Sequence, residues 1–156
     1  MVSYSELPEA VKAAFARYVI EQGSKADTFS VINGVSMVSG SEKEMVGELT
    51  VSEGSLNTWG IVHGGCLVTL AAATAGTLVV LNGYNCVTLS CNVNFLRPAR
   101  GSVIRCTARP EKVGRSTSVI NVSLTDEQGK EVASGTYTFF HTGAVNEESL
   151  RKAGVQ

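Results

Sequence analysis

The residues best placed to do chemistry lie in a loop from Asn57 to Gly65, which carries His63 and ends on two glycines, Gly64 and Gly65. An uncharged apolar segment, residues 66–81, follows directly and predicts a buried helix. The first N–H groups of a helix have no partner within it, and the helix dipole is positive at that end. This loop could therefore hold an anion, or the oxyanion that forms when a carbonyl group is attacked.

The usual general base is missing from the same region. Residues 55–109 include no aspartate or glutamate, although carboxylates are common proton acceptors in hydrolytic sites. Three groups could substitute: His63 acting through a water molecule, or Glu48 or Glu53 reaching in from the preceding segment. The sequence thus predicts a site that polarises a carbonyl group but does not identify what removes a proton.

The cysteines and histidines do not predict a metal site. The four cysteines form no C-x-x-C pair, and the two histidines are 78 residues apart. Cys86, Cys91 and Cys106 lie in apolar runs, and we expect them to be small buried residues. Cys66, three residues after His63, is considered as a nucleophile because a helix N-terminus stabilises a thiolate.

Composition limits the classes of partner. The 156 residues carry a net charge of −1 and no basic run, which argues against nucleic acid. Only 17% of the residues are charged, which indicates that much surface is buried, including a subunit interface. Residues 1–26 contain three glutamates among their apolar residues and no signal-peptide core, so we expect a cytoplasmic protein.

Periodicity predicts the elements that must position the loop. Helical spacing predicts a helix at about residues 7–21, and alternation predicts a strand within 43–53. After the apolar helix, strands are expected at 87–95, 102–110, 116–125 and 131–141, joined as an antiparallel meander by short connections. We expect His141, at the end of the last strand, to lie on the surface, and residues 143–156 to form a polar tail.

The apolar helix has two interpretations. Its length would suit a short membrane span, but no lysine or arginine flanks it and the following sequence is rich in strands. A helix that is apolar on all sides in a soluble protein must be surrounded by protein. Its small residues would let a sheet wrap closely around it, so we expect no membrane partner; these residues are Ala71, Ala72, Ala73, Ala75 and Gly76.

This combination resembles the hotdog fold, an α+β architecture in which a curved antiparallel sheet wraps one long helix. Within that fold the chain is most similar to the PaaI-like acyl-CoA thioesterases of the phenylacetate-degradation type, over about residues 47–140. The supporting motifs are N-x-x-G-x-x-H-G-G from Asn57, Leu70-Ala71, Phe95-Leu96-Arg97-Pro98 and Val113-Gly114-Arg115. The resemblance implies one domain over residues 1–156 with its core at about 30–142, and hydrolysis of acyl-CoA or aryl-acyl-CoA thioesters without a separate cofactor.

The resemblance also implies roles for individual residues. The Gly64 amide would bind the thioester carbonyl, His63 and Gly65 would fix the turn, and Asn57 would hydrogen-bond at the same place. Asn57 has a second interpretation as a residue that shapes the loop. The expected contacts of the CoA nucleotide and pyrophosphate are Arg97, Pro98, Gly114, Arg115 and Ser116. The arginines can also be read as ordinary solvated strand residues. Such sites lie between subunits, which implies a homodimer or homotetramer.

The chain departs from the family at its catalytic carboxylate. The family places an aspartate or glutamate nine residues after the histidine, where this chain has Ala72. Thr88 occupies the place of a hydroxyl residue that assists water, but a threonine cannot take the proton from that water. Three hypotheses follow: a thioesterase with an unidentified base, a weak or inactive acyl-CoA binding or sensing protein, and a structural oligomer with an empty groove.

Overall fold

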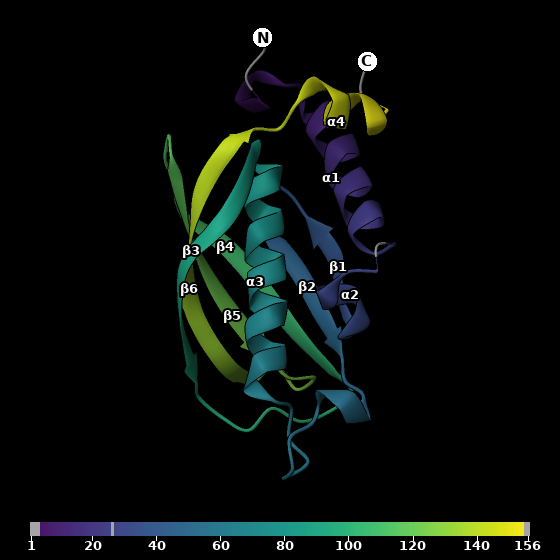
Figure 1. Cartoon of the computed structure of the whole chain (residues 1–156), viewed down its shortest axis with the longest axis vertical. Helices are drawn as coiled ribbons and strands as arrows, with labels where there is room; N and C mark the ends of the chain where they lie inside the picture. The colour runs from purple at the N-terminus through teal and green to yellow at the C-terminus, as the bar shows by residue number, and fades with distance from the viewer. Residues whose placement is uncertain (1–3, 26, 155–156) are drawn as a thin grey trace.

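A six-stranded antiparallel sheet curves around one long helix, α3, in the computed structural model, which describes residues 4–25 and 27–154 (Figure 1). The predicted domain limits, residues 1 and 156, lie outside the described residues. The described elements, grouped by type, are short 3-10 turns at Tyr4–Glu6 and Glu53–Ser55, helices α1 (Glu9–Gly23), α2 (Phe29–Ile32), α3 (Gly64–Leu81) and α4 (Glu147–Lys152), and strands β1 (Val35–Gly40), β2 (Met45–Thr50), β3 (Tyr84–Phe95), β4 (Val103–Val113), β5 (Thr117–Thr125) and β6 (Glu131–Ala144).

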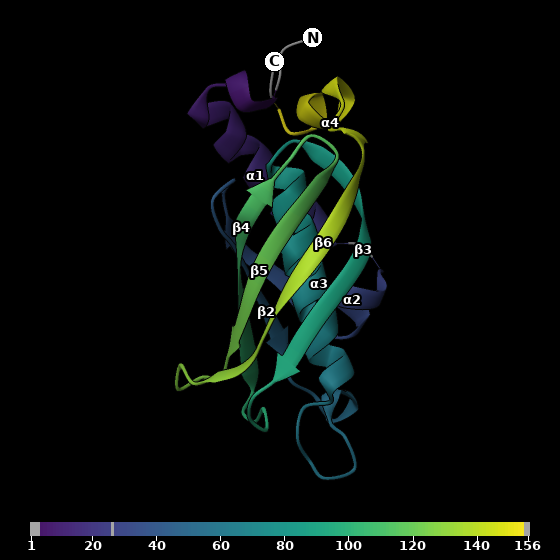
Figure 2. The same ribbon diagram turned by 90° about the vertical axis from the view of Figure 1, so that its left-hand side faces the viewer.

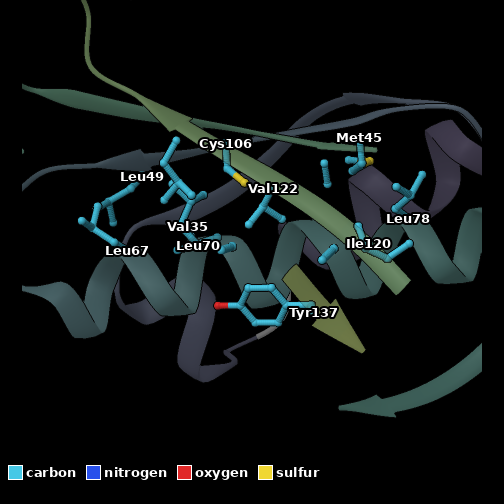
Figure 3. Close-up of a cluster of buried hydrophobic side chains, with 14 of the residues drawn as sticks. Val35, Met45, Leu49, Leu67, Leu70, Leu78, Cys106, Ile120, Val122 and Tyr137 are labelled. Atoms are coloured by element: carbon cyan, nitrogen blue, oxygen red, sulfur yellow. The ribbon is translucent and has the colours of Figure 1, made fainter. Parts of the chain in front are cut away.

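Helix α3 fills the concave side of the sheet, as its uncharged sequence predicts. Its length and hydropathy would also suit a membrane span, but here it is the core helix against which the strands pack. Alternate residues of β2 face it, and a side chain at Gly47 would collide with Thr74 of α3. Figure 3 displays the resulting apolar cluster, which includes Met45, Leu49, Leu70, Leu78, Ile120 and Tyr137. The predicted buried helix wrapped by a curved antiparallel sheet is therefore confirmed.

The strand order is β1-β2-β4-β5-β6-β3, so the predicted meander holds for β4, β5 and β6 and is wrong for β3. Strand β3 lies at the far edge and pairs with β6 along nearly its whole length. The connection, residues 96–102, passes below the start of α3, where Val62 N donates to Ala99 O (3.0 Å). Seven residues can span about 23 Å, well beyond the three strand spacings, about 14 Å, that separate β4 from β3.

The two edges of the sheet differ in their cover. Helices α1 and α2 pack against β1, whereas β3 is an open edge with large apolar side chains at the surface. Val87, Leu89 and Phe95 are 52%, 59% and 56% exposed. Cys91 is also exposed, so the expectation that it is buried is wrong, while Cys106 is fully buried. The cause is the edge position of β3: α3 packs against this strand and β6 pairs with one of its edges, but no described strand pairs with the other edge.

The ends of the chain contain more structure than the sequence predicts. Helix α1 lies where a helix is expected at 7–21, but α2 and β1 are additional elements. Strand β6 continues to Ala144, so the segment expected to be a polar tail begins inside a strand and includes α4. Figure 2 places α4 and the N-terminal helix at the end of the molecule opposite the loop before α3.

Candidate active site at the start of helix α3

His63 is the N-cap of α3, and its side chain organises the first turn. The ring Nδ1 accepts a hydrogen bond from the Gly65 amide (2.8 Å), which leaves the proton of the neutral ring on Nε2. The amides of Cys66 and Leu67 donate to the carbonyl oxygen of His63 (2.9 and 3.4 Å). Within the part of the chain that the structure describes, the amide of Gly64 has no hydrogen-bond partner, so it is the free donor at this helix end.

Gly64 also lies directly beneath an aromatic ring. A Cβ atom at this position would meet the ring of Phe95, at the end of β3, at 3.1 Å. Glycine thus allows the end of β3 to approach the helix terminus closely. A site that is positive from the helix dipole and partly walled by an apolar ring favours an oxygen atom that gains negative charge.

Asn57 shapes the loop that leads into α3. Its Oδ1 accepts hydrogen bonds from the amides of Trp59 (3.0 Å) and Ile61 (3.3 Å), and the Asn57 amide donates to the Ile61 carbonyl (2.9 Å). Gly60, with φ +69°, provides the left-handed turn residue in this loop. These contacts match the interpretation of Asn57 as a turn residue, and they place Trp59, 81% exposed, at the loop tip.

The groups considered as bases or nucleophiles are poorly placed for those roles. Glu48 points away from α3, on the opposite side of β2 from Gly47, and forms an ion pair with Arg105, so the suggestion that it reaches the site is wrong. Burial raises the pKa of the Cys66 thiol, which disfavours the thiolate. Glu53 is exposed in the short turn before the loop.

Ala72 and Thr88 lie on neighbouring elements. Ala72 is half-buried on α3, and Thr88 is exposed on β3 opposite Phe139 of β6. The threonine hydroxyls of α3 itself are engaged, because Thr69 and Thr77 donate to the carbonyls of Gly65 and Ala73 (both 2.8 Å). These two hydroxyls are therefore committed to the backbone of the helix.

A basic cavity of about 460 Å³ lies at the same end of the molecule, between the β3–β4 connection and the β5–β6 hairpin. Arg97, Arg100 and Lys130 line it together with Pro98, Asp126 and Glu127. Both carboxylates are engaged locally: Glu127 accepts from the amide and hydroxyl of Ser102, which lowers its pKa, and Asp126 accepts from the amides of Gln128 and Lys130. The lining thus carries three cations and two carboxylates, a formal net charge of +1.

The second group of predicted binding residues lies at the opposite end of the sheet. Gly114, Arg115 and Ser116 form the β4–β5 turn, next to the end of β6 (Figure 2). Strand β6 begins beside Arg97, which donates to the Glu131 carbonyl (2.7 Å), and reaches the turn ten residues later at His141. At about 3.3 Å per residue the two groups are about 33 Å apart. One chain therefore does not bring Arg97 and Arg115 together.

His141 is buried, so the expectation that it lies on the surface is wrong. It is 8% exposed, stacks on Tyr84 with ring centroids 3.9 Å apart, and hydrogen-bonds to Ser118. The signal was present in the sequence, because His141 continues the alternation of Tyr137 and Phe139, both of which face inward. Arg100 and Lys130 of the basic cavity were also not predicted, since only the fold brings their two loops together.

The sequence and the fold are similar to those of known thioesterases. The family model of the thioesterase superfamily matches residues 60–133. Acyl-coenzyme A thioesterase PaaI of Escherichia coli is 31% identical over 101 residues, which cover 64% of this chain and 72% of that protein. The solved PaaI structure matches with a TM-score of 0.77 over 85% of this chain and 97% of that chain, at 24% identity.

Two solved streptococcal proteins extend the comparison. The smu.793 protein of Streptococcus mutans, bound to acetyl CoA, has a TM-score of 0.71 and 29% identity, covering 78% of this chain and 97% of that one. A hypothetical thioesterase of Streptococcus pneumoniae was solved with alanine replacing an aspartate, and separately a threonine sixteen positions later. These two structures have TM-scores of 0.67 and 0.66 and identities of 32% and 30%, and each covers 70% of this chain and about 90% of its own. Together with the wrapped helix and its free amide, these matches assign the chain to the thioesterase superfamily, as a PaaI-like member with the hotdog fold.

Proposed function

We propose that this protein hydrolyses acyl-CoA thioesters to a free acid and CoA, with the Gly64 amide polarising the thioester carbonyl. The observation that carries the proposal is that Gly64 has the unpartnered first-turn amide of α3, held in place by the His63 cap. Such a donor stabilises the oxyanion of the tetrahedral intermediate more than the ground-state carbonyl. The acetyl CoA bound to the S. mutans relative supports CoA esters as the ligand class.

We propose that the working unit is at least a homodimer, because one chain separates the predicted CoA contacts by the length of the sheet. The open apolar edge of β3 is the surface that a second copy would cover. If two copies pair through β3 in antiparallel orientation, the Gly114–Ser116 turn of one lies near the Gly64 end of the other. Arg97 with its basic cavity, and Arg115 from the second copy, would then flank one CoA molecule. A homotetramer of two such dimers is part of the same proposal.

We further propose that Ala72 replaces the family's catalytic carboxylate. The support is spacing, because Ala72 and Thr88 are sixteen residues apart, as are the aspartate and threonine replaced in the S. pneumoniae variants. His63 does not take over as base, since its Nδ1 caps the helix and its Nε2 carries the proton in the neutral ring. Loss of a general base costs a factor of about 10² to 10⁴ in rate, so we expect slow turnover.

The missing base favours a second candidate function, the binding or sensing of an acyl-CoA ester without turnover. Aromatic acyl groups belong to both candidates, because the PaaI relative comes from the phenylacetic acid degradation operon. We also propose a cytoplasmic location, no metal or cofactor beyond the CoA of the substrate, and no nucleic-acid or membrane partner. The net charge of −1 supports the absence of a nucleic-acid partner, and the packing of α3 inside the sheet supports the absence of a membrane partner.

The test compares Gly64→Pro with Gly64→Ala. Gly64 is the first residue of α3, where proline is favoured, and the extended backbone of His63 (ψ 135°) suits a following proline. Both variants place a Cβ against Phe95, but only proline removes the N–H group. Release of CoA from short, long and aromatic esters is followed by chromatography, which avoids a thiol reagent that would also titrate four cysteines.

We expect Gly64→Pro to lower kcat by a factor of about 10² to 10³ relative to Gly64→Ala. Equal rates in the two variants would refute the role of the amide. If the wild type retains an ester at micromolar concentration but releases no CoA above the enzyme-free rate, the binding function replaces the enzymatic one.

A further inference from the structure

We infer that His141 is a positioning residue for CoA binding: through its Nδ1 it holds the β4–β5 turn so that the Arg115 guanidinium faces the ligand. This inference rests on the proposed function, because it takes Arg115 as a contact of the pyrophosphate. It concerns a residue that lies outside the motifs of the loop and the helix, on a different strand and at the other end of the sheet.

One backbone hydrogen bond ties His141 to the turn, and a second closes the turn itself. The His141 amide donates to the Ser116 carbonyl (2.9 Å), one step beyond the last paired residues of β5 and β6, Thr117 and Phe140. The turn itself is closed by the Gly114 amide, which donates to the Thr117 carbonyl (2.8 Å). The end of β6 is therefore hydrogen-bonded directly to this turn.

The His141 ring adds a side-chain contact to the residue at the tip. Nδ1 is 3.3 Å from the Arg115 carbonyl oxygen, and Nε2 is 2.8 Å from the Ser118 hydroxyl. Because a carbonyl can only accept, Nδ1 carries the proton, and Nε2 of the neutral ring then accepts from Ser118. Both ring nitrogens are thus hydrogen-bonded in one tautomer. In that tautomer the Nδ1–H group points toward the β4–β5 turn.

The ring has little freedom to leave this position. Ser118 is fully buried, His141 is 8% exposed, and Tyr84 covers one ring face with an interplanar angle of 12°. Arg115, in contrast, is exposed, and its guanidinium has no partner among the described residues. A rigid backbone with a free cationic side chain suits a phosphate contact, because less ordering is required when the ligand binds.

The test uses two substitutions that each keep one of the two hydrogen bonds of the His141 ring and remove the other. In His141→Asn, the amide nitrogen can occupy the place of Nδ1 and still donate to the Arg115 carbonyl. In His141→Gln, the longer side chain reaches Ser118 and loses the contact with Arg115. Ser118→Ala is the matched control, since it removes the other partner of the ring and leaves the Nδ1 contact in place.

The readouts separate positioning from general damage. Calorimetry with CoA gives Kd, and turnover of an acyl-CoA is compared with turnover of the same acyl group on N-acetylcysteamine, a thiol without nucleotide or pyrophosphate. Hydrogen exchange of the Gly114 amide reports directly on the turn. One hydrogen bond is worth a factor of about five in an equilibrium constant, so His141→Gln should raise Kd and KM for CoA compounds about fivefold.

We expect His141→Asn and Ser118→Ala to bind CoA within about twofold of the wild type, with kcat and turnover of the N-acetylcysteamine ester unchanged in all three variants. The Gly114 amide should exchange faster only in His141→Gln. Equal weakening by the Asn and Gln variants would overturn the inference, as would unchanged binding in His141→Gln when Arg115→Ala weakens it. A wild type that does not bind CoA would instead overturn the proposed function, and the inference with it.

Discussion

Under the proposal that Ala72 stands in place of the family's catalytic carboxylate, Ala72→Asp should supply a general base. Ala72 is half-buried on α3, so an aspartate carboxylate at this position is not enclosed in the core. The gain in kcat should be a factor of about 10² to 10⁴, the usual contribution of a general base, which corresponds to about 3 to 5.5 kcal/mol of activation free energy. Ala72→Asn, of the same shape but not basic, is the matched control.

The geometry also predicts which copy the new carboxylate serves. Ala72 is eight residues beyond Gly64, which places it about 12 Å further along the helix axis. The attacking atom must come within about 3.5 Å of a carbonyl carbon, and that carbonyl must lie within hydrogen-bond reach of the Gly64 amide. An aspartate side chain is too short to bridge the remainder, so the aspartate should act on a thioester held by Gly64 of a second copy.

A mixed dimer tests this directly. One chain carries Ala72→Asp together with Gly64→Pro, and the other is wild type, with different affinity tags so that the heterodimer can be isolated. A site shared between copies leaves one complete pair of groups, so the heterodimer should turn over acyl-CoA at about half the rate of the Ala72→Asp homodimer. Turnover only at the wild-type level would refute the shared site. No gain in the Ala72→Asp homodimer over Ala72→Asn would refute the replacement of the base.

Three further predictions concern assembly and stability. Leu89→Arg, on the open edge of β3, should give monomers in analytical sedimentation. Val38→Arg, on the covered edge strand β1, should leave the oligomer intact. Equal effects of the two variants would contradict pairing through β3. Leu70 is fully buried between α3 and the sheet, so Leu70→Ala should lower the free energy of unfolding in urea by about 3 kcal/mol. Ile32→Ala, at an exposed position, should change the free energy of unfolding by under about 0.5 kcal/mol. Similar losses in the two variants would contradict the packing described. Burial, assisted by the charges of Glu42 and Glu9, raises the pKa of Tyr4 to about 12 from 10.0. The stabilising contribution of the protonated Tyr4 is therefore complete below pH 10 and is lost as the pH rises toward 12. Tyr4→Phe should flatten that alkaline decline in thermal melts, and an unchanged decline would contradict this role of Tyr4.

The sequence was sufficient to predict the parts of the fold that depend on local pattern. Helix α3 could be placed because 66–81 lacks charge, and β4 to β6 because their apolar residues alternate. Strand β1 was missed because Val35, Met37 and Val38 do not alternate cleanly, and its face is defined only when α1 and α2 cover it. The position of β3 could not be read, because pairing with β6 is decided by contacts far apart in the chain.

The candidate site likewise contains residues that the local sequence predicts and residues that it does not. The His63 cap and the Gly64 amide follow from local sequence, since a cap and its helix are neighbours. Arg97 and Arg115 were predicted as one group because the family resemblance implies that both contact CoA, although antiparallel strands carry them to opposite ends of the sheet in one chain. His141 was judged from its place at a strand end, where the alternation with Phe139 would have placed it inside.

The position of β3 beside β6 constrains the order in which the chain can fold. The paired residues are separated by 38 residues at Phe95 and Ala133 and by 60 at Tyr84 and Ala144, so this part of the sheet closes long loops. Such distant pairing slows folding. During synthesis α3 and β3 leave the ribosome before β6 exists, with the apolar residues of β3 unpaired on both edges. Until β6 is made, both edges of β3 are open to pairing with wrong partners. Pairing with β6 protects one of them, and the outer edge stays open until the proposed second copy covers it.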